Sequence, residues 1–334
     1  MYTLGIETSC DETSVSVVNN GTDILSNVVA SSLEFHQQYG GVVPEIAFRT
    51  QLETIVAVTD DAIKKAGIAR GDLALVSVTN GPGLLGSLLV GISFAKALSL
   101  SLRIPLIGVN HLYSHIYAGY LKEKQVRLPF VGLVVSGGHT SLFLVKDFAT
   151  IKTLGQTQDD ACGEAFDKVA KILGLGYPGG PLIEAIARQG DPQALTLQCS
   201  GTQQPLNFSF SGIKTAVLYY VQKKFPRGIA NTRAGRQMQA DIAASFQESV
   251  IDTLLEKSFH ACKLTKINRL VVGGGVVANM RLREAFEKRA AQQHVEVYFP
   301  TKALCMDNAA MVAGFGYQLF KRGARSNLSL NAGM

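Results

Sequence analysis

Residues 73–84 read Leu-Ala-Leu-Val-Ser-Val-Thr-Asn-Gly-Pro-Gly-Leu, and the α/β character of the protein is visible in this stretch. Its first seven residues are the apolar run expected of a buried parallel strand. The glycines and proline at 80–83 predict a tight turn, and the apolar residues that follow predict a buried helix ending near Leu102. Lys96 lies within that helix, which argues against a membrane span of ~20 uncharged residues. A buried strand, a glycine turn and a helix together indicate an α/β protein.

The second half of the chain repeats this order of elements. Arg269–Val272 predicts a buried strand, which leads through the glycines at 273–275 into a helix through Arg289. Each half also contains a predicted hairpin with a polar tip, at residues 3–18 and 130–145. We therefore expect two related α/β lobes, each presenting a hairpin tip and a glycine turn toward a common cleft.

Two further helices are expected in the first and last parts of the chain. Residues 31–66 look helical because apolar residues recur on one helix face. A final helix is expected to begin at Asp307 and to continue through Lys321. If this last helix folds back onto the first lobe, Asp307 can reach residues that lie far away in the sequence.

His111 and His115 are four residues apart in a segment that its apolar neighbours allow to be helical. This spacing places both imidazoles on one helix face, where they can converge on one metal ion. A metal site needs at least one more ligand, and Asp307 is attractive because the last helix can deliver it. The full set of acidic candidates is Asp11, Glu12, Asp159, Asp160, Glu164, Asp167 and Asp307. The alternative is a pair of partly buried histidines bonded to backbone or solvent.

Four glycine turns, at residues 81–86, 136–138, 179–180 and 273–275, are expected at strand ends or helix starts. Backbone N–H groups point outward at such places and the helix dipole favours anions, so the turns indicate nucleotide or phosphate binding. None has the Walker A spacing or a full dinucleotide fingerprint. Ordinary tight turns are the alternative.

Charge and cysteine content narrow the class of protein. The net charge of +6 and the isoelectric point of about 9.0 permit a polyanionic partner. Five cysteines without a CxxC pair argue against a disulfide framework or a zinc knuckle, and the N-terminal residues lack a secretory signal. We therefore expect a cytoplasmic protein with no membrane association. Its basic residues cluster at Lys223, Lys224, Arg227, Arg233 and Arg236, at Arg281, Arg283, Lys288 and Arg289, and at Lys321, Arg322 and Arg325.

Motifs that follow one another along residues 3–316 resemble those of the Kae/Qri/TsaD family of tRNA adenosine threonylcarbamoyltransferases, formerly called glycoproteases. They are residues 4–13, the 80–83 turn, His111 with His115, and residues 135–140, 163–168, 177–181, 208–212, 273–279 and 307–310. The resemblance implies the actin/Hsp70-like (ASKHA) fold, with two ribonuclease-H-like lobes and a cleft between them. We expect residues 1–128, completed by a C-terminal helix over 311–334, to form the N-terminal lobe and residues 129–310 to form the second lobe.

The resemblance also implies roles for individual residues. His111, His115 and Asp307 would hold one divalent metal ion, iron or zinc. Asp11 would lie at the reacting end of the substrate, as a base or as a positioning group. An adenylate substrate, or an adenine nucleotide such as ATP or ADP, would contact Val134, Val135, Ser136, Gly137, Gly138, Asp167, Gly180, Glu184 and Asn279.

The function implied is acyl transfer to tRNA. A threonylcarbamoyl group would pass from threonylcarbamoyl-AMP to the exocyclic amine of the adenosine 3′ of the anticodon in ANN-decoding tRNAs, with release of AMP. The implied partners are the paralogue TsaB as dimer mate, the ATPase TsaE, and TsaC as the source of the substrate. The alternatives are a metallopeptidase of the glycoprotease type and a non-catalytic nucleotide-dependent scaffold. Against the peptidase, the histidine pair lacks the adjacent Glu that a zinc peptidase helix uses as base.

Overall fold

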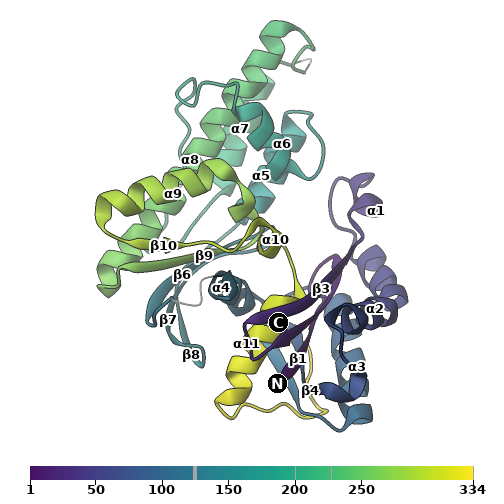
Figure 1. The fold of residues 1–334 in the computed structure, drawn as a ribbon. Coiled ribbons are helices and arrows are strands. Elements are labelled where there is room, and N and C mark those ends of the chain that lie inside the picture. Colours follow the sequence, from purple (N-terminus) through teal and green to yellow (C-terminus); the bar gives the residue numbers. More distant parts are fainter. Residues whose placement is uncertain (123–125, 200, 227, 334) are drawn as a thin grey trace. The chain divides into compact units, whose positions relative to one another are not determined.

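The computed structural model describes residues 1–122, 126–199, 201–226 and 228–333 (Figure 1). The contacts of the chain group into two compact units. Unit 1 comprises Met1–Val126, Asp147–Thr150 and Pro300–Met334, and unit 2 comprises Arg127–Lys146 and Ile151–Phe299. The lobe boundaries expected from the sequence, after residues 128 and 310, stay a prediction.

Unit 1 is built on a five-stranded sheet with the strand order β3-β2-β1-β4-β5. Strands β1, β2 and β3 are antiparallel neighbours, whereas β4 and β5 run parallel to β1. The prediction of a buried parallel strand over residues 73–79 is thus confirmed by β4. The strands are β1 (Tyr2–Glu7), β2 (Glu12–Asn19), β3 (Asp23–Ser31), β4 (Leu73–Gly81) and β5 (Leu106–Asn110).

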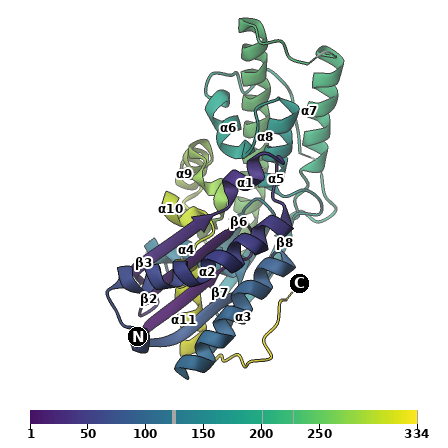
Figure 2. The ribbon, with the colours of Figure 1, turned by 90° about the vertical axis from the view of Figure 1, so that its right-hand side faces the viewer.

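Helices cover both faces of this sheet. In Figures 1 and 2, α2 and α3 lie on one face, and α4 and α11 lie on the other. Strand β1 serves both layers, because Leu4 and Ile6 join the core that α2 and α3 cover, whereas Gly5 between them faces α11. The helices are α1 (Leu33–Gln37), α2 (Pro44–Ala66), α3 (Leu85–Leu102), α4 (His111–Lys122), α10 (Lys302–Cys305) and α11 (Ala309–Lys321).

The prediction of one helix over residues 31–66 is wrong. Strand β3 continues to Ser31, and the helical residues divide into α1 and α2 with a break at 38–43. Gly40 has a φ of +69° within this break, a left-handed conformation that glycine adopts without steric cost. Pro44 occupies the first position of α2, where its missing N–H costs no helical hydrogen bond.

The last helix ends at Lys321 as expected from its pattern, but its expected start at Asp307 and the expected C-terminal helix over 311–334 are wrong. Asn308 caps α11, since its side chain accepts a hydrogen bond from the Met311 N–H, and Asp307 therefore precedes the helix. The helix ends at Lys321 and does not continue to residue 334. Gly323 has a φ of +91°, and beyond it the Ser326 N–H donates to the Leu106 carbonyl of β5. The C-terminal residues thus follow the edge of the sheet.

Unit 2 repeats the strand connectivity of unit 1, with the order β10-β9-β6-β7-β8. Strands β6 and β7 form an antiparallel hairpin, and β9 runs parallel to both β6 and β10. The predicted repetition of a hairpin followed by a strand, a glycine turn and a helix is confirmed. The elements are β6 (Phe130–Val135), β7 (Thr140–Asp147), β8 (Thr150–Gln156), β9 (Arg269–Gly273), β10 (Glu296–Tyr298), α5 (Cys162–Ile172), α6 (Gly179–Ala187), α7 (Ser211–Lys224), α8 (Arg233–Thr265) and α9 (Met280–Gln293).

Helix α3 is long and apolar enough to cross a membrane by length and composition. In the structure, Leu88, Ile92 and Ala95 of this helix are buried in the core of unit 1, and α3 packs against α2 and β4. The helix is therefore a core element of a folded unit, as expected.

We expect Gly5→Ala to destabilise the protein. A methyl group at this position would lie 2.2 Å from the Ala309 carbonyl oxygen and 2.6 Å from the Ala313 nitrogen, so α11 would have to move away from β1. Overpacking of this kind costs about 1–3 kcal/mol, and more where backbone must shift. Thermal unfolding monitored by circular dichroism measures the effect. Gly71→Ala is the matched control because its new methyl group would meet open space; equal unfolding temperatures for the two variants would contradict the prediction.

Candidate metal centre and nucleotide site

The two histidines lie in the first turns of α4, which begins directly after β5. Asn110 sets this start, because its side chain accepts hydrogen bonds from the N–H groups of Leu112 and Tyr113. The ring centroids of His111 and His115 are 4.6 Å apart. Both rings are almost completely buried, so the predicted helix and the predicted common face are confirmed.

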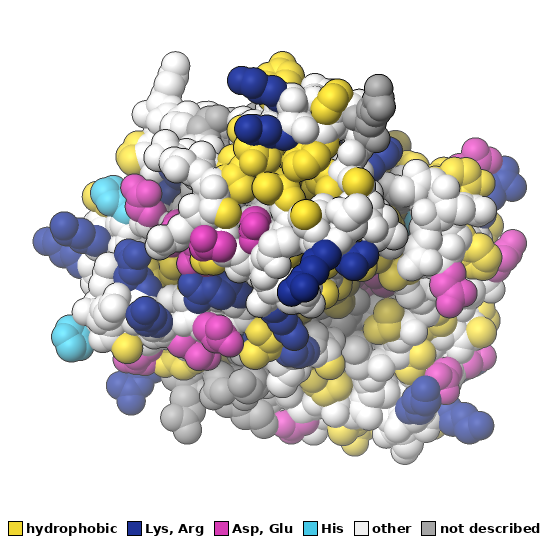
Figure 3. Space-filling model, turned by 90° about the horizontal axis from the view of Figure 1, so that it is seen from above, with side chains coloured by type: hydrophobic (Ala, Val, Ile, Leu, Met, Phe, Trp, Pro, Cys, Tyr) yellow, Lys and Arg dark blue, Asp and Glu magenta, His cyan; other side chains and the backbone are white. Residues whose placement is uncertain are grey.

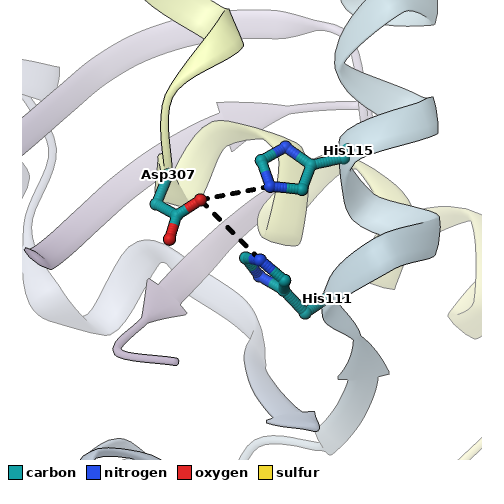
Figure 4. A group of neighbouring side chains, drawn as sticks. All are labelled: His111, His115 and Asp307. Atoms are coloured by element: carbon teal, nitrogen blue, oxygen red, sulfur yellow. Dashed lines mark ion pairs between the residues drawn. The ribbon is translucent and has the colours of Figure 1, made fainter. Parts of the chain in front are cut away.

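Asp307 meets this pair from the other end of the chain, in the segment between α10 and α11. Figure 4 shows both rings directed toward its carboxylate. The Asp307 Oδ1 atom lies 3.1 Å from His115 Nε2 and 3.7 Å from His111 Nε2. One potential ligand atom from each residue lies within 4.8 Å of the other two. The three residues predicted to share a site are thus brought together within unit 1.

The hydrogen bonding of His115 fits a metal ligand. Within the described part of the chain, no group forms a hydrogen bond with either of its ring nitrogens, although both are buried. Nε2 is close to Asp307, but the alignment is not that of a hydrogen bond. Since an unsatisfied buried nitrogen costs free energy, a cation shared by His115, His111 and Asp307 would compensate it. Two imidazoles and one carboxylate are donors that suit zinc or iron.

Glu7 supports His111 from behind. It is buried at the end of β1, and its Oε2 atom lies 3.1 Å from His111 Nδ1. The same carboxylate accepts hydrogen bonds from the Ser9 N–H at 2.6 Å and the Thr79 hydroxyl at 2.6 Å. A proton on Nδ1 that is donated to Glu7 leaves the Nε2 lone pair facing Asp307, as a metal ligand requires. The role of Glu7 beside His111 was not predicted from the sequence. The sequence pattern that could have indicated it is a single carboxylate at the end of an apolar strand.

The carboxylates around His111 set its pKa. Burial alone would lower the pKa of this imidazole, but the negative charges of Asp307 and Glu7 outweigh burial and raise it to about 9. For Glu7, burial would raise the pKa, whereas the charge and hydrogen bond of His111 outweigh this and hold it below its usual value. Without a metal, the structure therefore favours an ionised Glu7–His111 pair.

Asp11 lies on the tip of the β1–β2 hairpin and is only 8% exposed. Its neighbour Glu12 is also close to Asp307. Burial, followed by the charges of Asp307 and Asp11, raises the pKa of the Glu12 carboxyl well above its usual value. The structure thus places Asp11 beside a carboxyl group that tends to keep its proton.

Two of the other acidic candidates have structural partners inside unit 2. Asp159 accepts hydrogen bonds from the Phe210 and Ser211 N–H groups at the start of α7. Asp160 forms ion pairs with Lys168 and Lys214, both at 2.7 Å. Both carboxylates therefore have partners within the protein, and neither needs a metal ion to satisfy it.

The residues predicted to bind a nucleotide lie around the turn after β6. Val134 and Val135 are buried in the strand, and Gly137 and Gly138 are exposed in the turn. The turn rests on the start of α5, because the N–H groups of Gly163 and Glu164 donate to the carbonyls of Ser136 and Gly137.

The glycine turn after β9 approaches this strand closely. A methyl group on Gly274 would lie 2.4 Å from the Val135 carbonyl oxygen, and the φ of Gly274 is +100°. Only glycine fits there. The two turns are therefore neighbours at one end of the unit 2 sheet.

The remaining predicted contacts are linked to one another. Asp167 accepts a hydrogen bond from the Gly179 N–H at 2.7 Å, which ties α5 to the start of α6 near Gly180. Glu184 of α6 accepts one from the Met280 N–H and pairs with Arg188. Met280 follows Asn279, so all of the predicted contacts after α5 lie near one another.

Asn279 is held by both ends of its side chain. Its oxygen accepts from the Leu282 N–H and caps α9, and its amide nitrogen donates to Gln247 at 2.7 Å. A cavity of about 440 Å³ opens beside Glu184 and Gln247. This size is within the range of small-molecule sites. The cavity is lined by Glu184, Ala187, Arg188, Pro192, Ala244, Gln247, Glu248, Met280, Arg281 and Glu284.

The basic clusters differ in the exposure of their side chains and in whether these side chains form ion pairs. Lys223 and Lys224 at the end of α7, with Arg233 and Arg236 at the start of α8, are all exposed. Figure 3, which views this end of unit 2, shows Lys and Arg side chains next to a group of hydrophobic ones. In contrast, Arg281 of the second cluster is paired with Glu248. Arg227 lies outside the described residues.

Solved structures with a similar fold support the expected fold class. Full-length HypF in a phosphate- and nucleotide-bound form matches 97% of this chain and 47% of its own with a TM-score of 0.62 and 14% identity. Component A of the (R)-2-hydroxyglutaryl-CoA dehydratase of Acidaminococcus fermentans matches 95% of this chain and 98% of its own with a TM-score of 0.53 and 15% identity. At this identity the likeness concerns the fold alone, and the predicted actin/Hsp70-like fold is confirmed.

Sequence relatives identify the family. A model of the family TsaD, tRNA N6-adenosine threonylcarbamoyltransferase, matches residues 23–314. Proteins named tRNA N6-adenosine threonylcarbamoyltransferase are 48% identical in Clostridium kluyveri, over 98% of this chain and 95% of the relative, and 50% identical in Thermosipho africanus, over 99% and 98%. The relative in Symbiobacterium thermophilum is 49% identical over 98% and 94%. The chain therefore belongs to the TsaD family of tRNA N6-adenosine threonylcarbamoyltransferases.

Proposed function

We propose that this protein transfers the threonylcarbamoyl group of threonylcarbamoyl-AMP to N6 of the adenosine 3′ of the anticodon in ANN-decoding tRNAs. The observation that carries the proposal is the similarity to transferases of this name, about half identical over nearly the whole chain. The buried group of His111, His115 and Asp307 is consistent with it.

The chemistry sets three tasks for the protein. The adenosine amine attacks the carbamoyl carbon, the bond from that carbon to the phosphate oxygen breaks, AMP leaves, and the amine loses a proton. Because the mixed anhydride is already activated, the protein must mainly hold the adenylate, anchor the acyl end and position the amine. We assign proton acceptance from the amine, or its orientation, to Asp11.

His111, His115 and Asp307 would hold one iron or zinc ion. When bound, such an ion supplies Lewis acidity and a template for the acyl end of the substrate. Glu7 keeps Nε2 of His111 available for this ion through the contact at Nδ1.

The adenylate would lie in unit 2. The exposed turn at Gly137 and Gly138 offers backbone N–H groups to the phosphate, as glycine turns do in other nucleotide sites. Asp167, Gly180, Glu184 and Asn279 would surround the nucleoside, next to the 440 Å³ cavity. The same site would accept ATP or ADP.

Membership of the family supports the partners proposed next. We propose that tRNA contacts the exposed basic cluster of α7 and α8, that TsaB is the dimer mate, that TsaE is the associated ATPase, and that TsaC supplies the substrate. We also propose that the protein works in the cytoplasm.

A metallopeptidase is the less favoured function. In a zinc peptidase a carboxylate next to the metal activates water. Here Leu112 follows the first histidine, and Glu7 is buried and already bonded to Ser9, Thr79 and His111. A nucleotide-dependent scaffold without catalysis is the other alternative, and an activity assay distinguishes it.

The proposed function is tested by reconstitution with the partner proteins, unmodified tRNA, threonine, bicarbonate and ATP. We expect N6-threonylcarbamoyladenosine in the nucleosides of the product, measured by mass spectrometry. Asp11→Ala should lower the rate by about 100-fold or more, since the loss of a general acid–base group typically costs about 100- to 10,000-fold. Unchanged product formation by this variant would contradict the role of Asp11, and glycoprotein cleavage without modified tRNA would favour the peptidase.

Metal binding should depend on pH. Because the pKa of His111 is about 9 in the metal-free protein, a proton must leave this ring when a metal binds at neutral pH. We expect zinc affinity to rise about tenfold from pH 7 to pH 8 and to level off above pH 9, as one displaced proton requires. Competition with a chromophoric chelator measures this. Affinity that does not change between pH 7 and pH 8 would contradict the assignment.

The metal ligands can be tested by metal content. His115→Ala and Asp307→Ala should each lose most of the bound metal, because two protein ligands rarely retain a divalent ion. The exposed His260→Ala is the matched control and should keep the metal content of the parent protein. Elemental analysis of the purified proteins gives the answer; equal metal in all three variants would place the site elsewhere.

Binding of tRNA should weaken steeply with salt. The exposed Lys223, Lys224, Arg233 and Arg236 would neutralise phosphates and release counterions. Replacing Lys223 and Lys224 by Gln should reduce the slope of log affinity against log salt by about 2 units at most, one per lost phosphate contact. Filter binding at several salt concentrations measures the slope. The control is Lys263→Gln at the other end of α8, and an equal slope for both proteins would exclude the α7–α8 cluster.

A further inference from the structure

Asp11 lies in the tip of the β1–β2 hairpin, where the backbone forms no ladder hydrogen bonds between these two strands. The ladder between β1 and β2 ends at the pair of Glu7 and Ser14, so residues 8–13 lie outside it. Buried backbone carbonyls need hydrogen-bond donors, and an unpaired one costs free energy. The donors for this tip must therefore come from other elements.

All four consecutive carbonyls from Ser9 to Glu12 receive such a donor. The Leu84 N–H donates to Ser9 O at 2.7 Å, and the Ser87 hydroxyl donates to Cys10 O at 3.0 Å. The donors to the carbonyls of residues 10, 11 and 12 include Gln51 of α2 and Ser32, which precedes α1. Each of these donors belongs to unit 1.

Gln51 is the central donor. Its amide nitrogen donates to Cys10 O at 3.0 Å and to Glu12 O at 2.9 Å, which are the carbonyls on either side of Asp11. The side chain is completely buried. Its own oxygen has no hydrogen-bond partner within the described part of the chain. Because a flipped amide would place this oxygen against two carbonyls, the orientation of Gln51 is determined.

Ser32 and His36 form the second support. The Ser32 hydroxyl donates to Asp11 O at 2.6 Å, so its oxygen must accept from His36 Nε2, 3.0 Å away. The other ring nitrogen, Nδ1, accepts the Val43 N–H at 3.2 Å. The donor and acceptor of each hydrogen bond from Val43 through His36 and Ser32 to Asp11 are thus determined. His36 is a neutral imidazole with its proton on Nε2. Both Ser32 and His36 are buried.

We propose that Gln51, Ser32 and His36 are positioning residues that hold Asp11 in place for the transfer reaction. Gln51 holds the carbonyls before and after Asp11, and Ser32 holds its own carbonyl. The backbone of the tip therefore has little freedom, so the Cα atom from which the Asp11 carboxylate extends keeps one location. These three residues thus act on the reacting end through the backbone of the tip. The proposal rests on the role given to Asp11 under the proposed function.

The physical reason for such support is the sensitivity of catalysis to distance. A displacement of about 1 Å in a catalytic group can cost about 100-fold in rate. A turn that keeps its carbonyls toward solvent would allow such displacements. A purely structural role for the three residues would lower stability but would leave the dependence of the rate on Asp11 unchanged.

The first test uses a double-mutant cycle in the reconstituted assay. Gln51→Met keeps the length of the side chain and removes the donors; we expect kcat to fall about 10- to 100-fold, with KM for tRNA and metal content within about twofold of the parent. Asp11→Ala combined with Gln51→Met should be no slower than Asp11→Ala alone, because Gln51 acts through Asp11. Multiplied losses in the double variant would overturn the proposal. Gln37→Met, at an exposed position, is the matched control.

The second test separates the two ends of the His36 ring, and it stands even if Gln51→Met fails to fold. His36→Gln can retain the donor toward Ser32, whereas His36→Asn retains only the acceptor toward Val43. We expect His36→Gln and Ser32→Thr to keep most of kcat, and His36→Asn and Ser32→Ala to lose about tenfold or more at unfolding temperatures matched to His36→Gln. Equal kcat for His36→Gln and His36→Asn would overturn the proposal.

The outcomes also separate this proposal from the proposed function. Absence of modified tRNA with the parent protein, or full activity of Asp11→Ala, would refute the assigned reaction or the assigned role of Asp11. Loss of activity in Asp11→Ala together with full activity in folded Gln51→Met would refute the positioning role alone.

Discussion

The close approach of α11 to β1 is the constraint on which the site depends. Gly5 has no side chain on the face toward α11, so the backbone of residues 309–313 can lie directly against the strand. The Ala309 N–H donates to the Ser14 hydroxyl at 2.9 Å, which fixes the first turn of the helix at β2. Asp307 lies two residues before this contact. A residue near the end of the chain is thus placed against histidines about 200 positions earlier.

Two carboxylates lie on opposite sides of the His111 ring. His111 is held between Glu7 on one side and Asp307 on the other, and all three are largely buried. Burial opposes charge on each group, but the opposite charges offset this cost for one another. A metal ion would take the place of the proton on the Asp307 side, while Glu7 continues to orient the ring from behind. The same geometry therefore serves the protonated and the metal-bound ring.

Most elements of the fold were predictable because their patterns are local. The apolar run before Asn80, the glycine turns and the histidine spacing all depend on short-range sequence, and the structure contains each of them. The errors fell where local pattern competes with tertiary contacts. The helix expected over 31–66 does not begin at residue 31 because β3 extends to Ser31 to pair with β2, and no helix reaches residue 334 because the residues after Gly323 follow β5. Neither contact has a local signal.

The sequence by itself determined the α/β class, the two repeated halves, the helix with two histidines and the motifs that resemble the family. It could do so because strand, turn and helix preferences act over a few residues. Only the tertiary structure decided that Glu7 supports His111 and that Gln51 bridges the carbonyls around Asp11. Such contacts join residues 39 to 104 positions apart. The residues that flank a glutamate or glutamine in the sequence are the same whether or not its side chain finds a partner after folding. Burial and hydrogen-bond geometry, which exist only after folding, give these side chains their roles.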